Sequence, residues 1–315
     1  MPFDEERRGI VSDLNRLKIE NKIIKFLDIS YVGVGGEPYV FVFPKNIDEL
    51  KKLIEYVSSK EIPFWVIGNS TKLLVRDGKI PKIAISLAKF DKQELYDKKD
   101  RFVLKVGAGT SLSYVIACGI KNGFQSVEVI SGIPGSVGGA VKKNAGTKFG
   151  SISEFVEEVD VLSTSNGNFE IKTKKPCFGY RTSDISDSDI VVSATLSFKK
   201  AKPSEVKEKV SAYLKRRYQT QPINTKNFGC IFLNPSESEP AGKIIDELGL
   251  KGFRISKRVK ISNIHANFIE NEGGASFAEV LQLINEVKER VKNERNVELK
   301  EEVVILNDEN GYSRS

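Results

Sequence analysis

A dense run of glycines stands near the middle of this 315-residue chain. Such density suits neither a strand nor a helix interior, because each glycine loses backbone entropy on folding. It suits a backbone that approaches a ligand closely and presents successive N–H groups to an anion such as a dinucleotide pyrophosphate. From density alone, a tight loop with purely structural glycines explains the run equally well. The run and the segment after it comprise Gly132, Ile133, Pro134, Gly135, Ser136, Val137, Gly138, Gly139, Ala140, Asn144, Ala145 and Gly146.

A second polar loop follows a predicted strand–helix–strand unit. Residues 39–43 are an apolar strand, and a helix follows from Asn46, a good N-cap, with Leu50, Leu53, Ile54 and Val57 on one face. Residues 63–67 form the next strand. The loop at its carboxyl end begins with Gly68-Asn69-Ser70-Thr71-Lys72. Open α/β arrangements bind ligands at such an end, so this loop is a second candidate binding segment.

The remaining elements alternate irregularly between strand and helix. The first 20 or so residues are polar and helix-prone. Further helices are predicted from Ser111 to Gly123, over about 203–221, and from a capping box at Ser276. Strands are predicted at 102–106, 159–162, 190–194 and 302–306, with a turn at 165–168. Mixed elements without an internal repeat indicate an α+β protein of two or three domains.

Composition excludes several classes of protein. The net charge is +7, but most basic residues have acidic neighbours, and no basic stripe interleaved with aromatics indicates nucleic acid. No apolar run approaches the roughly 20 residues of a membrane span, and the N-terminal residues lack the apolar stretch of a signal peptide. Three cysteines and one histidine, His265, give no metal-ligand spacing. We therefore expect a cytoplasmic protein without a metal site, and a structural role for His265.

Seven ordered motifs between about residues 30 and 306 resemble those of the UDP-N-acetylenolpyruvoylglucosamine reductases. The glycine run matches G-I-P-G-[ST]-V-G-G-A with a following N-A-G. The matching segments are Gly132–Gly146, Phe178–Ser183, Arg217–Pro222, Gly229–Pro235, Ala241–Gly252, His265–Ile269 and Leu299–Val303. Any one match could arise by chance, whereas the ordered set is specific. The short block between Arg181 and Pro203 resembles the smaller of the two family types.

The resemblance implies an FAD-binding fold of the vanillyl-alcohol-oxidase/PCMH type, with two α+β subdomains and a third α/β substrate domain. The implied boundaries are 21–85 plus 299–315, 86–202, and 203–298. FAD is the implied cofactor, NADPH the reductant, and a UDP-N-acetylglucosamine enolpyruvyl ether the substrate, with no nucleic acid or membrane partner and a monomeric state. The implied FAD-binding residues are Gly68, Asn69, Ser70, Thr71, Lys72, Leu73, Leu74, Gly132, Ile133, Pro134, Gly135, Ser136, Gly138, Gly139, Asn144, Ala145 and Gly146.

The implied catalytic residues are Arg181, Cys230 and Glu302, with Tyr180 and Asn234 binding substrate. Hydride addition to the enolpyruvyl group leaves negative charge, which a fixed arginine stabilises. Cys230 stands where a serine is common, and a thiol with a reference pKa of about 8.5 is the better proton source. Glu302 serves as an acidic donor if a dry pocket keeps it protonated. Alternation along a strand points Glu301 the other way.

Several positions depart from the family pattern. Ser70 replaces a glycine, Lys72 an asparagine, and residues 147–149 an A-Y-G segment, while Leu233 stands where a lysine or arginine is common. Residues 257–258 replace a glycine pair. These departures leave two alternatives open beside the reductase. One is a flavin oxidase or dehydrogenase with another substrate, and the other is a non-catalytic nucleotide-binding paralogue.

Overall fold

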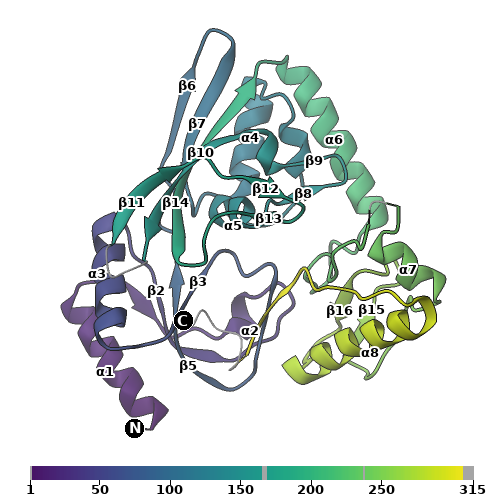
Figure 1. Cartoon of the computed structure of the whole chain (residues 1–315), viewed down its shortest axis with the longest axis horizontal. Coiled ribbons are helices and arrows are strands. Elements are labelled where there is room, and N and C mark those ends of the chain that lie inside the picture. The colour runs from purple at the N-terminus through teal and green to yellow at the C-terminus, as the bar shows by residue number, and fades with distance from the viewer. Residues whose placement is uncertain (1, 165–168, 237, 308–315) are drawn as a thin grey trace.

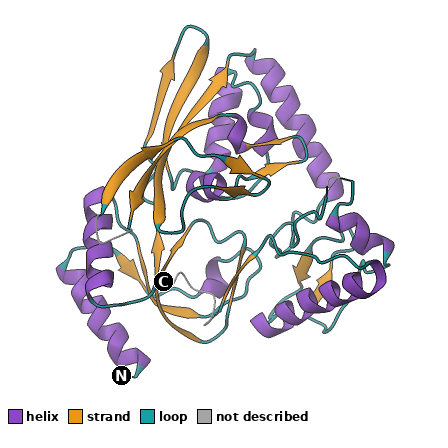
Figure 2. Ribbon diagram, in the orientation of Figure 1, coloured by secondary structure: helices purple, strands orange, loops and turns teal. Residues whose placement is uncertain are grey.

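A computed structural model of the chain describes residues 2–164, 169–236 and 238–307. Helices and strands are mixed throughout, which confirms the α+β class (Figure 2). One sheet with its helices lies low in Figure 1, a larger sheet lies above it, and a third, mainly helical part lies to the right. No described helix is long and apolar enough to cross a membrane.

The first sheet has four strands in the order β1-β2-β5-β3. Strand β5 runs parallel to both β2 and β3, whereas β1 pairs antiparallel with β2. A separate parallel pair joins β4 to β17, so the end of the described chain returns to this part of the molecule. The bounds are β1 Asn21–Lys22, β2 Glu37–Val42, β3 Phe64–Ile67, β4 Leu73–Val75, β5 Lys79–Ser86 and β17 Val304–Leu306, with helices α1 Phe3–Arg16, α2 Phe26–Ile29 and α3 Ile47–Ser59.

Helix α3 forms for the reasons that the sequence predicts. The Asn46 side chain accepts a hydrogen bond from the Glu49 amide, and Leu50, Leu53, Ile54 and Val57 are all buried. The helix-prone beginning of the chain forms α1, which buries Ile10 and Leu14. Both helices therefore cover the core that the first sheet shares with the second.

The second sheet is antiparallel, with five strands in the order β11-β10-β14-β7-β6. Helices α4 and α6 pack against each other beside it (Figure 1). The predicted caps of α4 are confirmed, because the Ser111 side chain accepts from the Tyr114 amide and Gly123 has a φ of +86°. The turn predicted at 165–168 lies outside the described residues. The bounds are β6 Gln93–Asp97, β7 Arg101–Gly107, β10 Val156–Ser163, β11 Glu170–Lys174, β14 Asp189–Lys199, α4 Leu112–Asn122, η1 Val127–Ile130, α5 Val137–Lys142, η2 Ile152–Glu154 and α6 Pro203–Thr220.

The third part has its own apolar core, built mainly under one long helix, α8. The predicted capping box is present, with Ser276 and Glu279 bonding each other's backbone amides. Short two-stranded ribbons complete the described structure. The bounds are α7 Ala241–Glu247, α8 Phe277–Arg295, β15 Val259–Ile261 and β16 Ile269–Asn271, with the small pairs β8 Gly146–Thr147, β9 Gly150–Ser151, β12 Phe178–Gly179 and β13 Thr182–Ser183 in the second part.

Two expectations about local structure are wrong. Gly138 and Gly139 lie inside a short helix, α5, rather than in a loop. Close packing explains one of them, because a methyl group on Gly138 would lie only 2.9 Å from Ala108 Cβ. The final strand begins at Val304 rather than at Glu302, since Glu302 donates its amide to Ile231 O instead of joining β17.

Candidate functional site

The two loops predicted to bind FAD face each other. A methyl group added at Gly68 would lie 2.9 Å from Ser136 Oγ, and one at Gly135 would lie 3.9 Å from Thr71 Oγ1. Gly68 and Asn69 from one loop, and Ser136, Gly138 and Gly139 from the other, line a cavity of about 690 Å³. A cavity of this size lies within the range of small-molecule and cofactor sites. The juxtaposition of the two loops supports a dinucleotide site between the first and second sheets.

Polar groups without partners mark the same loops. The buried hydroxyls of Ser70, Thr110 and Ser131 have no hydrogen-bond partner among the described residues. Each hydroxyl belongs to, or lies next in sequence to, a segment of the cavity or the glycine run. Gly139 has only Ser136 Oγ within 4 Å of the position where a Cβ would stand, at 3.8 Å. Unpaired buried donors and an open glycine surface fit a bound polar cofactor such as FAD.

Not every predicted residue points at this cavity. Leu74 is completely buried in the core of the third part, whereas Leu73, its neighbour in β4, packs against the core around Phe26 and Trp65 in the first part. Part of the cavity lining was not predicted from the sequence. Gly109 lines the cavity, although its Gly-Ala-Gly segment matches no nucleotide fingerprint. The other lining residues that were not predicted are Ile54, Phe64, Val66, Ile67, Ser86, Leu87, Ala88, Ala108, Lys142, Thr164, Ser186, Asp187, Ser188, Asp189, Ile190 and Val191.

Arg181 is held by the segment that follows the glycine run. Its guanidinium donates to Gly146 O at 2.6 Å and to Asn144 O at 3.4 Å. Asn144 is itself buried, with a positive φ of 45°, and its side chain donates to Gly179 O at 2.8 Å. Asn144 and Gly146 were predicted to bind FAD. In the structure they fix the position of the candidate catalytic arginine.

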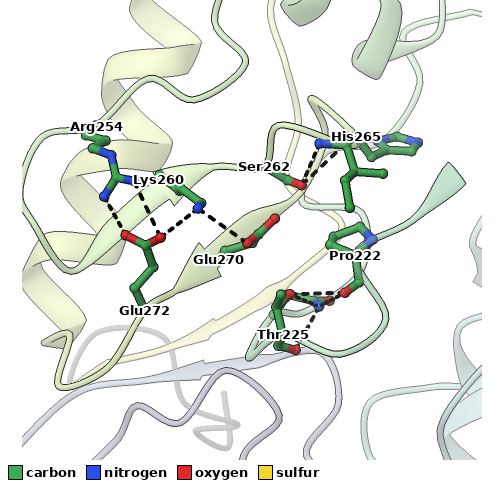
Figure 3. Close-up of polar contacts among 10 residues, drawn as sticks. Pro222, Thr225, Arg254, Lys260, Ser262, His265, Glu270 and Glu272 are labelled. Atoms are coloured by element: carbon green, nitrogen blue, oxygen red, sulfur yellow. Dashed lines mark hydrogen bonds and ion pairs between the residues drawn. The ribbon is translucent and has the colours of Figure 1, made fainter.

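Cys230 lies on a loop that follows α6, and side-chain amide bonds shape that loop. Asn227 Nδ2 donates to Pro222 O and to the backbone and hydroxyl oxygens of Thr225, while Asn227 Oδ1 accepts from the Gly229 amide at 2.7 Å. Figure 3 shows Pro222 and Thr225 converging on this point. Gly229 has a φ of +76°, a conformation that glycine adopts without strain, and it brings Cys230 to the site.

Glu302 lies beside Arg181, another candidate catalytic residue, and also beside a lysine. Glu302 Oε1 lies 3.7 Å from Arg181 Nε and 3.0 Å from Lys72 Nζ. Lys72 Nζ also donates to Cys230 O at 2.6 Å. Glu301 points away and pairs with Lys288, which agrees with the predicted opposite directions. Two cations, Lys72 and Arg181, therefore flank the Glu302 carboxyl group.

Charges from four side chains act on the Cys230 thiol. Burial raises the pKa of Cys230; Lys72, Arg181 and Arg217 oppose that rise, and Glu302 adds to it. Arg217, near the end of α6, is one of these charges although its motif carried no predicted role. Burial lowers the pKa of Arg217, whose Cδ lies only 2.8 Å from where a Cβ on Gly132 would stand. Arg217 thus links the glycine run to the thiol.

The predicted substrate residues Tyr180 and Asn234 also come together. The Asn234 amide donates to Tyr180 Oη at 3.4 Å, and Asn234 Oδ1 accepts from the Ala241 amide. The Arg181 guanidinium carbon lies 5.2 Å from the centre of the exposed Tyr180 ring. The two residues therefore lie next to the candidate catalytic arginine.

Polar groups farther along the third part have local partners. Glu272 binds Arg254 and Lys260, and Lys260 also binds Glu270 (Figure 3).

His265 Nδ1 accepts from the Asn267 amide at 3.2 Å. Burial lowers the pKa of His265, with a smaller contribution from Lys251. These contacts within the third part favour the structural role predicted for His265.

Comparison with known proteins assigns both halves of this arrangement. Residues 38–171 match the FAD binding domain family, and residues 221–306 match the C-terminal domain of UDP-N-acetylenolpyruvoylglucosamine reductase. The reductase of Syntrophus aciditrophicus is 36% identical over 88% of this chain and 89% of its own length. That of Thermotoga maritima is 35% identical over 87% and 94%.

A solved structure agrees with the sequence relatives. The crystal structure of UDP-N-acetylenolpyruvylglucosamine reductase from Thermus caldophilus superposes with a TM-score of 0.76 at 32% identity. The match covers 92% of this chain and 100% of that one. The fold is therefore the FAD-binding fold predicted from the motifs. The chain belongs to the UDP-N-acetylenolpyruvoylglucosamine reductase family.

Proposed function

We propose that this protein reduces the enolpyruvyl ether of UDP-N-acetylglucosamine to UDP-N-acetylmuramate, a precursor of bacterial peptidoglycan. The observation that carries the proposal is that Arg181 and Glu302 pair, and that Lys72 joins Glu302 to the backbone of Cys230, although these residues come from distant parts of the sequence. This cluster adjoins the two loops of the FAD cavity through Lys72 and Gly146. A carboxylate-binding cation and a proton source beside a flavin site suit reduction of an enol ether.

FAD fits between the two loops that bear Gly68 and Ser136. When bound, it carries a hydride from NADPH, the reductant that we propose, to the enolpyruvyl double bond. The protein's part is to present backbone amides and hydroxyls to the cofactor and to hold the substrate against it. The buried hydroxyls of Ser70, Thr110 and Ser131 are the side chains that we assign to cofactor contacts.

Arg181 and Cys230 divide the remaining chemistry. A hydride added at C3 of the enolpyruvyl group leaves an electron pair at C2 that spreads into the carboxylate. The Arg181 guanidinium forms a forked pair with that carboxylate and stabilises the charge. The Cys230 thiol gives its proton to C2, and the resulting thiolate takes a proton from solvent. Tyr180 and Asn234, which lie beside Arg181, bind the substrate's polar groups.

Glu302 completes the cluster by orienting its cations. Its carboxylate lies beside the Arg181 side chain and so restrains the guanidinium that binds substrate. Only 18% of each of these two side chains is exposed, and low exposure makes such an interaction stronger than at the surface. We assign Glu302 to the active site on this ground.

We further propose a monomer in the cytoplasm, where NADPH and nucleotide sugars are available, with no nucleic-acid partner. The proposed domains are 21–85 with 299–315, 86–202, and 203–298. Pairing of β17 with β4 supports the return of the chain to the first of these. The separate apolar core under α8 supports the third.

A turnover assay on the purified protein tests the function. The protein should be yellow and should oxidise NADPH only when the enolpyruvyl sugar nucleotide is added. Rapid oxygen consumption with a small alcohol or sugar, and none with the sugar nucleotide, would instead indicate an oxidase. A colourless protein that still binds a uridine nucleotide would indicate a non-catalytic relative.

A further inference from the structure

Lys72 is a charged group within the cluster whose position the sequence does not explain. It lies in the loop between β3 and β4, where the family resemblance implied a contact with FAD. Its side chain turns instead toward the third part of the molecule. There its ammonium group contacts Glu302 Oε1 at 3.0 Å and Cys230 O at 2.6 Å.

The backbone around Lys72 strengthens this connection. Lys72 O accepts the Val304 amide at 2.8 Å, two residues beyond Glu302. A methyl group on Gly229 would lie 3.5 Å from Lys72 Nζ, so the Cys230 loop packs closely against the ammonium group. The Glu302 amide in turn donates to Ile231 O, next to Cys230. Lys72 thus joins the cofactor loop to both segments that carry candidate catalytic groups.

The charges explain what such a contact does. Glu302 lies between two cations, Lys72 and Arg181, and the Lys72 contact is the shorter of the two. Opposite charges at these distances attract each other, so the two contacts restrain the position of the Glu302 side chain.

On the basis of the proposed function, we propose that Lys72 is a positioning residue of the reductase site. Its ammonium group fixes the Glu302 side chain and the backbone of Cys230. Lys72 therefore acts through the other two residues. Its effect on turnover must then depend on Glu302.

A double-mutant cycle tests this dependence. The set is Lys72→Met, Lys72→Arg, Glu302→Gln and the Lys72→Met/Glu302→Gln double variant, with exposed Lys52→Met on α3 as the matched control. We expect Lys72→Met to lower kcat/KM by about 100-fold, as misplacement of catalytic groups does. Lys72→Arg should recover a large part of that loss, and Lys52→Met should resemble wild type.

The double variant decides between coupling and independence. If Lys72 acts through Glu302, the double variant will be only a few-fold worse than the poorer single variant. Losses that multiply would overturn the proposal, as would a Lys72→Met enzyme with wild-type kcat/KM. Melting temperature and flavin absorbance of each variant separate a loss of folding from a loss of positioning.

Alkylation of Cys230 gives a second readout that needs no turnover. It is measured across pH in a Cys118→Ala/Cys177→Ala background, so that Cys230 is the one thiol left. The charged groups facing this thiol are Lys72, Glu302, Arg181 and Arg217. Loss of the lysine charge raises the pKa of Cys230, so Lys72→Met should move the alkylation midpoint to higher pH, and Lys72→Arg should restore it.

The two readouts separate this inference from the proposed function. A wild-type protein that does not reduce the sugar nucleotide refutes the function, and the alkylation profile still tests the placement of Lys72. An unchanged or lower midpoint in Lys72→Met refutes the placement. An active wild type with multiplying losses refutes the inference alone.

Discussion

The two loops that form the FAD cavity have the same predicted role, but their side chains act differently. The segment 132–146 keeps the family pattern and works mainly through its backbone, with glycines open to the cavity and carbonyls that hold Arg181. The segment 68–72 departs from the pattern, and Lys72 extends out of it to Glu302 and Cys230. In the function that we propose, one loop supplies a surface for the cofactor, whereas the other also supplies a charge beside the candidate catalytic residues.

This difference shows which property of a loop can be predicted from the types of its residues. Glycine is typical of positions where the backbone lies close to another group. A close approach predicted from glycine does not depend on which side of the loop faces the ligand. The direction of a long side chain such as Lys72 depends on segments more than 150 residues away in the sequence. We call Lys72, Glu302 and Cys230 the side-chain cluster, and the segment 132–146 the backbone cradle. Substitutions in these two regions should therefore impair the protein in different ways.

Cys230→Ala should have the largest effect, because it removes the proposed proton donor to C2. We expect kcat with the sugar nucleotide to fall by roughly 10²–10⁴-fold, the range for general-acid groups. Stopped-flow absorbance should show that flavin reduction by NADPH persists while reoxidation by substrate slows. Cys230→Ser is the matched variant and should retain more activity than alanine. Equal slowing of both half-reactions would contradict the assigned role.

Arg181→Met tests the cation that the backbone cradle holds in place. We expect kcat/KM to fall by about 10²–10³-fold, because a fixed donor to developing charge is lost. Arg181→Lys keeps the charge but not the fork, so it should recover only part of the activity. The two variants should retain bound FAD, as measured by absorbance. Loss of the flavin together with activity would show that the two regions are not separable.

The cradle itself is tested by two neighbouring glycines of α5. Gly139→Ala places a methyl group beside the cavity with no protein atom closer than 3.8 Å, and alanine favours a helix over glycine by about 1 kcal/mol. We expect FAD affinity to fall about tenfold, while the melting temperature of the flavin-free protein stays level or rises. Isothermal titration and thermal denaturation measure the two properties.

Gly138→Ala is the matched variant in that helix. Its methyl group would lie 2.9 Å from Ala108 Cβ, so we expect the fold itself to lose about 1–3 kcal/mol. If both variants lowered stability and affinity alike, Gly139 would be a packing residue rather than part of a ligand surface. That outcome would remove the contrast between the two regions.

His265, outside both regions, should give the smallest effect. Burial lowers the pKa of His265 below its ordinary value of 6.5, so the unfolded chain binds its proton more readily than the folded protein. Stability from this group is present above pH 6.5 and is lost as pH falls below it. In melting curves against pH, His265→Gln should reduce the decline on the acid side. An unchanged decline would rule out this contribution.

Local sequence signals predicted much of the fold. Asn46, Ser111, Gly123 and Ser276 correctly mark helix ends, because caps depend on neighbouring residues only. The parallel pairing of β4 with β17 joins residues more than 200 positions apart, and no local signal carries it. Helix α5 was missed because close packing on Ala108, rather than helix propensity, accounts for Gly138 there.

Motif identity named three candidate catalytic residues, Arg181, Cys230 and Glu302. In the structure Arg181 and Glu302 pair, and Lys72 joins Glu302 to the backbone of Cys230. Residues 186–191, which line the cavity, were missed. They lie at the beginning of β14 and in the loop before it, and these segments have no distinctive composition. The contact of Lys72 with Glu302 was missed for another reason, because only the fold brings these two residues together.

We propose that the loops 68–72 and 132–146 hold a flavin against the cluster of Arg181, Cys230 and Glu302. Anaerobic addition of NADPH to the purified yellow protein, followed by the enolpyruvyl sugar nucleotide, tests this arrangement in one absorbance trace. We expect bleaching of the flavin band by NADPH and its full return when the sugar nucleotide is added. A flavin that bleaches but stays reduced with this substrate, or a protein without flavin, would show that the arrangement is wrong.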